Sequence, residues 1–197
     1  AVPSRQFDIS KIDFELLSRE FAHTRRKNLL LRDLDELVNQ KLAKMLFANP
    51  QRIDYYDRYQ EIIDAYNAEQ NRATIEKTFM DLMELASSLD TEQQRYVREG
   101  FSSDEELSVY DLLFSENLTK QEIETIKKVS VDLLTKIKQQ IAKLDHWTDK
   151  QETKAIVDNL IRNTLWQELP NSYDVSDIQT YQKKIYEYVY MRYPEVA

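Results

Sequence analysis

A single glycine, Gly100, occurs in the 197 residues, and this scarcity constrains the fold more than any other feature of the chain. A chain of average composition would contain roughly a dozen glycines. Hairpins between strands and phosphate-binding loops both depend on glycine, because glycine alone adopts positive φ, or allows a close backbone approach, at little cost. Neither a β-rich fold nor a glycine-rich nucleotide loop is therefore expected.

Apolar residues recur at helical spacing along most of the chain, and no segment alternates as a strand would. Leu34, Val38, Leu42 and Met45, for example, would share one buried face. We therefore predict an all-α fold, a bundle of roughly seven or eight helices with no sheet. The expected helices cover residues 8–23, a segment ending near 47, 53–67, 70–98, a short segment after Ser103, 120–144, 149–169 and a last segment after Asp174 or Ser176.

The ends of these helices carry their own signals. Ser103, Thr119 and Thr148 each precede a Glu or Gln by three residues, which predicts a capping box, and Gly100 is expected as a C-terminal cap. Asn49-Pro50 predicts a break, since proline cannot continue a helix. We place a boundary near residue 50, between a helical segment over 1–50 and a bundle over 51–197, with residues 68–72 as the alternative. Trp147 and Trp166 are expected in the core.

Charge is unevenly distributed along the chain, whose net charge is −8. Residues 51–117 carry 6 basic and 16 acidic side chains and are poorly suited to a nucleic-acid backbone. Local basic groups lie outside this stretch, and tyrosines off the buried stripe of the last helix are candidates for a protein interface. The DNA-contact candidates are Arg25, Arg26, Lys27, Lys127, Lys128, Lys136, Lys138, Lys183, Lys184 and Arg192, and the partner-interface candidates are Tyr186, Tyr190 and Tyr193.

The sequence contains few residues in patterns that could perform catalysis. There is no cysteine, and the two histidines, His23 and His146, are far apart in the sequence, so no zinc site is expected. The acidic pair Asp35-Glu36 lies within a helical pattern, whereas a nucleotide-hydrolysing motor needs such a pair after a buried strand. Asp145 with Glu152-x-Lys154 is similar to a nuclease signature, but Glu152 and Lys154 would point in different directions on a helix.

We therefore predict no catalytic residue, no metal ligand and no cofactor in this segment. No apolar run approaches the ~20 residues that a membrane-spanning helix needs, so a cytoplasmic protein without membrane contact is expected. Since the chain begins at Ala1 without methionine, we expect it to be a piece of a longer protein.

The order of several short motifs resembles a known family. They are Phe7-Asp8 through Phe21, the Arg25–Leu37 stretch, Asn49-Pro50-Gln51-Arg52, Tyr66-Asn67, Arg98-Glu99-Gly100-Phe101, Asp104-Glu105-Glu106-Leu107, Tyr110-Asp111-Leu112-Leu113, Trp147, Thr153-x-Ala155-x-Val157, Leu165, Leu169-Pro170 and the tyrosine-rich end. Together these motifs resemble the C-terminal helical region of the motor (restriction, HsdR) subunit of type I restriction–modification enzymes, and the type IC branch in particular.

The resemblance implies a parent subunit that is an ATP-dependent translocase and site-specific endonuclease, using ATP and Mg²⁺ in domains upstream of this segment. Residues 1–50 would then lead to those motor domains. The C-terminal region would dock the motor on the methyltransferase–specificity core. The family's nuclease and nucleotide motifs have no counterpart here, so no catalytic residue is carried over.

Two hypotheses remain open from the sequence. The first is a non-catalytic assembly domain that joins the motor subunit to its methyltransferase core and contacts double-stranded DNA nearby. The alternative is a helical module that binds DNA in its own right, which the basic groups favour and the net charge of −8 opposes. A third hypothesis, an independent enzyme, would need a site that the sequence does not contain.

Overall fold

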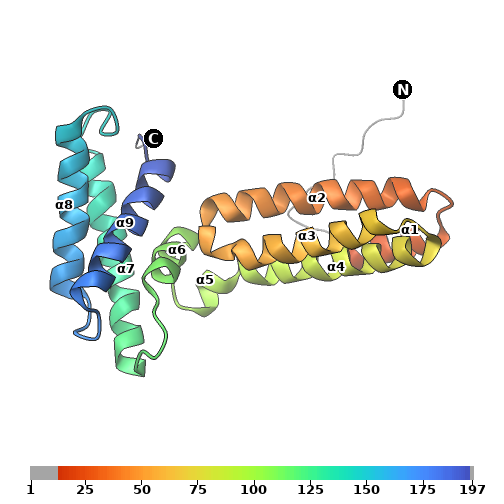
Figure 1. Cartoon of the computed structure of the whole chain (residues 1–197), viewed down its shortest axis with the longest axis horizontal. Helices are drawn as coiled ribbons and strands as arrows, with labels where there is room; N and C mark the ends of the chain where they lie inside the picture. The colour runs from red at the N-terminus through yellow and green to blue at the C-terminus, as the bar shows by residue number, and fades with distance from the viewer. Residues whose placement is uncertain (1–12, 196–197) are drawn as a thin grey trace. The chain divides into compact units, whose positions relative to one another are not determined.

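The computed structural model describes residues 13–195, and within this range it contains nine α-helices, one short 3₁₀ helix and no strand (Figure 1). The all-α prediction is confirmed. Phe7, Asp8 and the first residues of the first expected helix lie outside the described range. The helices are α1 (Phe14–His23), α2 (Lys27–Ala48), η1 (Pro50–Arg52), α3 (Ile53–Ala68), α4 (Arg72–Gln93), α5 (Arg95–Arg98), α6 (Asp104–Leu113), α7 (Lys120–Ile141), α8 (Gln151–Glu168) and α9 (Val175–Arg192).

The chain divides into two compact units, residues 1–94 and 95–197. The boundary expected near residue 50 lies inside the first unit, because α2 and α3 both pack on α4 and share one core with it. The observed division between Gln94 and Arg95 instead interrupts what the sequence predicts as one helix over 70–98. No proline or glycine marks that point, so composition gives no sign of it.

The first unit is built on the long helices α2, α3 and α4. Leu34, Val38 and Leu42 form the predicted buried stripe of α2, and they pack in one cluster with buried residues of α4. The short helix α1 joins this core through Phe21, whose ring stacks on that of Phe79 with 3.7 Å between ring centroids.

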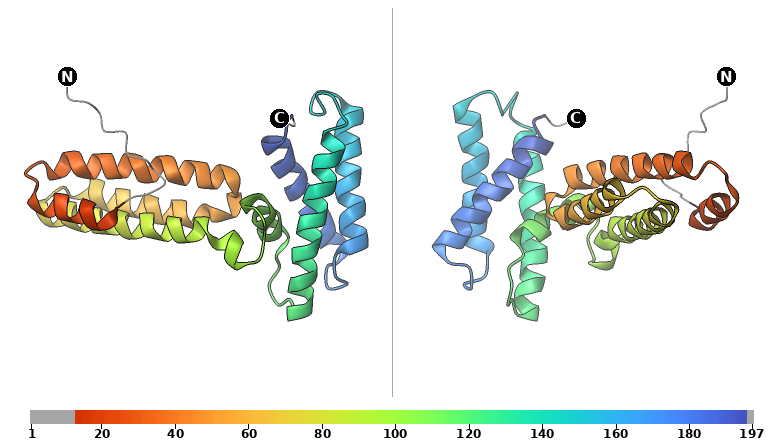
Figure 2. Two further views of the ribbon diagram at one scale, coloured as in Figure 1. Left: turned by 180° about the vertical axis from the view of Figure 1, so that it is seen from behind. Right: turned by 45° about the vertical axis from the view of Figure 1, so that its right-hand side comes forward.

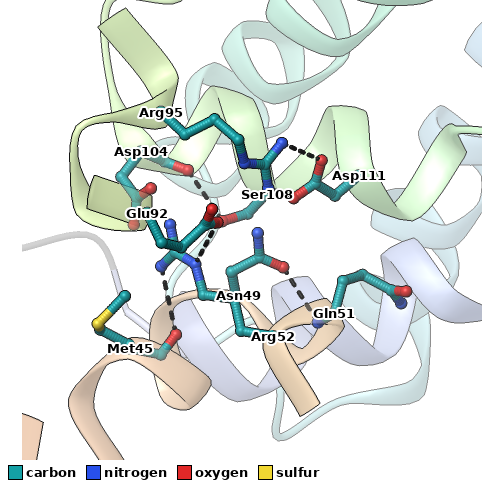
Figure 3. Close-up of polar contacts among 9 residues, drawn as sticks. All are labelled: Met45, Asn49, Gln51, Arg52, Glu92, Arg95, Asp104, Ser108 and Asp111. Carbon is teal, nitrogen blue, oxygen red and sulfur yellow. Dashed lines mark hydrogen bonds and ion pairs between the residues drawn. The ribbon is translucent and has the colours of Figure 1, made fainter. Parts of the chain in front are cut away.

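A buried ion pair joins the connection between α2 and α3 to the end of α4. The Arg52 guanidinium donates from Nε to Glu92 Oε1 at 3.1 Å and from Nη1 to the Met45 carbonyl oxygen at 3.4 Å (Figure 3). The side chains of Arg52 and Glu92 are only 2% and 7% exposed. The pair thereby joins η1, which follows α2, to the last turn of α4.

In the second unit α8 packs against both α7 and α9, and α6 packs on α7 and α9 (Figure 2). Its core includes Ile137 from α7, Ile161 from α8 and Ile185 from α9, all fully buried. Trp147, in the connection between α7 and α8, is also fully buried, as expected. Trp166 is 49% exposed, and its expected place in the core is wrong, because α8 turns Val157, Ile161 and Leu165 inward and Trp166 outward.

Most predicted caps are found, although not all. Gly100 has φ of +84° and ends α5 in a Schellman arrangement, in which the Phe101 amide donates to the Tyr96 carbonyl and the Gly100 amide to Val97. Thr119 forms a complete capping box with Glu122, and the pKa of Glu122 is lowered chiefly because its carboxylate accepts the Thr119 amide.

Two of the predicted capping boxes differ from the expectation. Ser103 accepts from the Glu106 amide, but Glu106 accepts from Ser102 instead of from the cap residue. Thr148 does not cap α8, which begins after Lys150, and the Thr153 hydroxyl instead donates to the Trp147 carbonyl oxygen at 2.6 Å.

Removing one charge of the buried pair should destabilise the first unit. We expect Glu92→Gln to lower the free energy of unfolding by about 3 kcal/mol, since it removes the negative charge that the buried Arg52 guanidinium contacts. The matched control is Glu84→Gln on the same helix, whose carboxylate is 74% exposed and pairs with Arg58. That change should cost less than about 1 kcal/mol. Urea denaturation measures both, and equal losses would contradict the expectation.

Candidate functional site

The three basic candidates of the first unit lie where α1 connects to α2. Arg25 and Arg26 are exposed and have no carboxylate partner among the described residues. Lys27 begins α2, pairs with Glu76 at 3.3 Å and lies 4.7 Å from the centroid of the Phe21 ring. The hydrogen bonds from Lys27 and Arg72 lower the pKa of the Glu76 carboxyl. Two cations of this group are thus open to an external anion, and the third is engaged within the unit.

Three lysines of α7 are engaged by carboxylates of the second unit. Lys127 pairs with Glu99 at 3.1 Å and also donates to the Glu99 carbonyl oxygen. Lys136 lies 2.6 Å from both Asp132 and Glu168, and Lys138 pairs with Glu105. Because Glu168 belongs to α8 and Glu105 to α6, Lys136 and Lys138 point to different sides of α7. These lysines join helices, and much of their charge is neutralised locally.

The remaining basic candidates belong to α7 and α9. Lys128, Lys183 and Lys184 are exposed, and the Lys184 ammonium lies 5.5 Å from the centroid of the Tyr181 ring. Arg192 is partly buried, and its guanidinium carbon lies 4.3 Å from the centroid of the Tyr188 ring. Burial lowers the pKa of Arg192. The ten candidates are therefore distributed over both units, and in the second unit they lie on several sides of the bundle.

The three candidate tyrosines surround Trp147. Tyr186 and Tyr190 meet its indole edge to face, with ring centroids 6.1 and 5.8 Å away, and the indole Nε1 donates to the Tyr193 carbonyl oxygen at 2.6 Å. Tyr193 also packs against Tyr188, and burial raises its pKa well above the ordinary value. Tyr193 is therefore part of the packing around Trp147, whereas Tyr190 keeps 38% of its surface exposed.

An open groove of about 530 Å³ runs between α8 and α9, and Tyr186 lines it. Its other lining residues are mostly polar, and only Lys183 among them was expected from the sequence. The sequence does not reveal this groove, because its walls come from two helices whose outward stripes are separated along the chain. The full lining is Gln151, Lys154, Ala155, Asp158, Gln179, Gln182, Lys183 and Tyr186.

The groove is richer in hydrogen-bond donors than in acceptors. Its single carboxylate, Asp158, accepts from Gln182 Nε2 at 3.0 Å. Burial, and to a smaller extent the charge of Asp158, raises the pKa of Tyr186. Lys154 and Lys183 have no carboxylate partner among the described residues, and the Lys154 ammonium lies 5.9 Å from the centroid of the Tyr190 ring. An anionic group could therefore be held there by two cations and several amides.

The two acidic patterns set aside in the sequence do not form a metal centre within residues 13–195. Asp35 accepts a 2.8 Å hydrogen bond from the Tyr59 hydroxyl across the first unit, which is a packing role. Asp145 lies in the connection after α7 and is largely exposed, whereas Glu152 and Lys154 belong to α8. No group of three or more histidine or carboxylate side chains in the described range could hold a metal ion. Likewise, none of the helices described is long and apolar enough to cross a membrane.

Comparison with known proteins decides the family. The profile of a family described as the C-terminal region of type I restriction enzyme HindI endonuclease subunit-like proteins matches residues 2–193. The chain belongs to this family. No curated protein and no solved structure matches it. The resemblance drawn from the sequence motifs is thereby confirmed at the level of the type I restriction enzyme subunit.

The motifs that pointed to this restriction-enzyme family serve to build the scaffold. In the first unit, the Asn49 side chain accepts from the Gln51 amide and Arg52 forms the buried pair with Glu92 (Figure 3). In the second unit, Arg95 and Asp111 form a two-contact ion pair that joins α5 to α6. These motif residues therefore hold together the helical scaffold of each unit.

Burial of tyrosines should make the domain sensitive to alkali. Burial raises the pKa of six of the twelve tyrosines, which are Tyr59, Tyr110, Tyr173, Tyr186, Tyr188 and Tyr193. Because the folded state holds these protons more tightly than the unfolded state, this stability is fully present below about pH 10 and is lost as the pH rises above it.

We therefore expect the native protein to ionise far fewer tyrosines than the urea-unfolded protein just above pH 10, as read from tyrosinate absorbance. The urea midpoint should fall over the same pH range. Identical titration curves for the native and unfolded protein would contradict the burial of these rings.

Proposed function

We propose that this chain is the non-catalytic assembly domain of the motor subunit of an ATP-dependent type I restriction–modification enzyme, joining that subunit to the methyltransferase–specificity core. The observation that carries the proposal is the family match over residues 2–193, which is the C-terminal region of an endonuclease subunit. The exposed aromatic residues of α8 and α9 support a role in protein contact, since interfaces are enriched in aromatic side chains.

The chemistry of the enzyme would belong to the rest of the parent subunit. In this proposal the parent is an HsdR-type protein of the type IC branch that acts in the cytoplasm and uses ATP and Mg²⁺ in its upstream domains. No residue of this chain is assigned a part in nucleotide binding, in magnesium binding or in DNA cleavage.

A binding experiment tests the assembly role. We expect the chain, immobilised through an N-terminal tag, to retain the purified methyltransferase–specificity core of the same enzyme. We also expect a motor subunit truncated before this region to fail to enter the complex on size-exclusion chromatography. No retention by the chain, together with normal assembly of the truncated subunit, would refute the assembly role.

DNA binding is the second candidate function, and a specific observation favours it in the first unit. Arg25 and Arg26 lie next to each other in the connection between α1 and α2, and both are exposed without a carboxylate partner among the described residues. Contacts with DNA phosphates would require such available positive charges. The acidic chain should bind a random duplex only weakly.

Any such binding should weaken steeply as salt is raised, because it would rest on release of counterions. We expect the double substitution Arg25→Ala and Arg26→Ala to reduce the slope of log K against log salt concentration by about two. The control is Lys136→Ala, whose charge is neutralised by neighbouring carboxylates. Absence of any shift at low salt in an electrophoretic assay would rule out this function.

A further inference from the structure

We propose that the outward face of α8 and α9 docks an acidic amphipathic helix of a partner protein. This inference deepens the proposed function, since it rests on the assembly role and specifies the surface and the chemistry that would perform it. We define the docking face as the groove between the two helices with the exposed side chains along its rims.

The docking face consists of two stripes that run along antiparallel helices. On α8, Ala155, Asp158, Arg162 and Trp166 recur at helical spacing on one side. On α9, Val175, Gln179, Lys183, Tyr186 and Tyr190 do the same. Because α8 and α9 pack directly on each other, members of both stripes line one groove, and the remaining members extend each stripe beyond it.

Apolar groups lie at the two ends of the docking face, and polar groups lie between them. Trp166 and Val175, 49% and 53% exposed, lie next to the connection between α8 and α9. Tyr190 lies at the other end, beside Lys154. The 12 residues from Lys154 to Trp166 span about 18 Å of helix axis. A partner helix of about three to four turns, with an apolar side chain near each end, would cover this distance.

The middle of the docking face carries an excess of positive charge in a chain whose net charge is −8. Lys154, Arg162 and Lys183 have no carboxylate partner among the described residues. The one carboxylate in the lining of the groove, Asp158, is already engaged by Gln182. A partner helix with aspartate or glutamate at its centre would complement these cations, and such complementarity determines which partner is accepted.

A DNA backbone would also complement the cations, but it fits the rest of the docking face poorly. Phosphates gain nothing from the exposed indole of Trp166 or from Val175, whereas apolar partner side chains bury them. The basic residues also number only three, in a unit whose acidic residues outnumber the basic ones. The exposed apolar ends therefore favour a protein over a duplex.

The test compares substitutions on the docking face with matched substitutions on α7, in the intact chain. One variant is Trp166→Ser, and its control is Val131→Ser, another exposed apolar residue on a helix of the same unit. The second variant is the pair Lys154→Glu and Lys183→Glu, and its control is the pair Lys120→Glu and Lys128→Glu. The ligand is the purified methyltransferase–specificity core, binding is measured by biolayer interferometry, and circular dichroism establishes that every variant folds.

We expect each variant on the docking face to raise Kd at least about tenfold and each control to change it by less than about twofold. A photocrosslinking amino acid at position 166 should capture a segment of the core that is helical and acidic at its centre. Equal Kd values for wild type and face variants would overturn the docking face while leaving the assembly role in place. Crosslinks to DNA, or to a segment without acidic residues, would also overturn it. Failure of the wild-type chain to bind the core would refute the assembly role itself.

Discussion

Side-chain capping of helix ends is the interaction on which both units depend. A chain with one glycine cannot end most of its helices in the left-handed conformation that glycine favours. The helices α1, α2, α6 and α8 instead end at residues with extended backbone. At the helix starts, side chains accept backbone amides, namely Asp13, Asn71, Ser103, Thr119 and Asp174 for α1, α4, α6, α7 and α9. These caps set where each helix begins, and the apolar stripe of each helix determines which face it turns to the core.

The helices could be predicted from the sequence because their signals are local, but the division into two units could not. The spacing of apolar residues and the caps at Thr119 and Gly100 are signals that involve only a few neighbouring residues. The existence and the ends of most helices can therefore be predicted from the sequence. The division between Gln94 and Arg95 depends on which distant helices share a core, and no local break accompanies it. The position of Trp166 could not be predicted either, because the sequence does not fix which face α8 turns to the core. In the structure Leu165 faces the core and the neighbouring Trp166 faces outward.

The candidate binding residues illustrate a second limit of sequence-based prediction, which is that the sequence does not show which positive charges are neutralised in the fold. The sequence identifies the cations but does not show which carboxylates lie beside them. Lys127, Lys136 and Lys138 are paired with Glu99, Glu168 and Glu105, so they hold helices together, whereas Lys183 keeps its charge available. Lys154 is not among the DNA-contact candidates from the sequence, because its value as a binding residue arises only when α9 places Lys183 across the groove.

The residues that fix local geometry and those that form the proposed docking face play different physical roles. Arg52, Gly100 and Asp111 maintain buried or strained local geometry, so a substitution at any of them would disturb the fold itself. Trp166 and Lys183 are exposed and contribute little to the core, so they can vary without unfolding the bundle. A scaffold of this kind would let related restriction enzymes retain the same helices while each matches the docking face to its own partner. Recognition between subunits would then be specific to one enzyme even where the fold is shared.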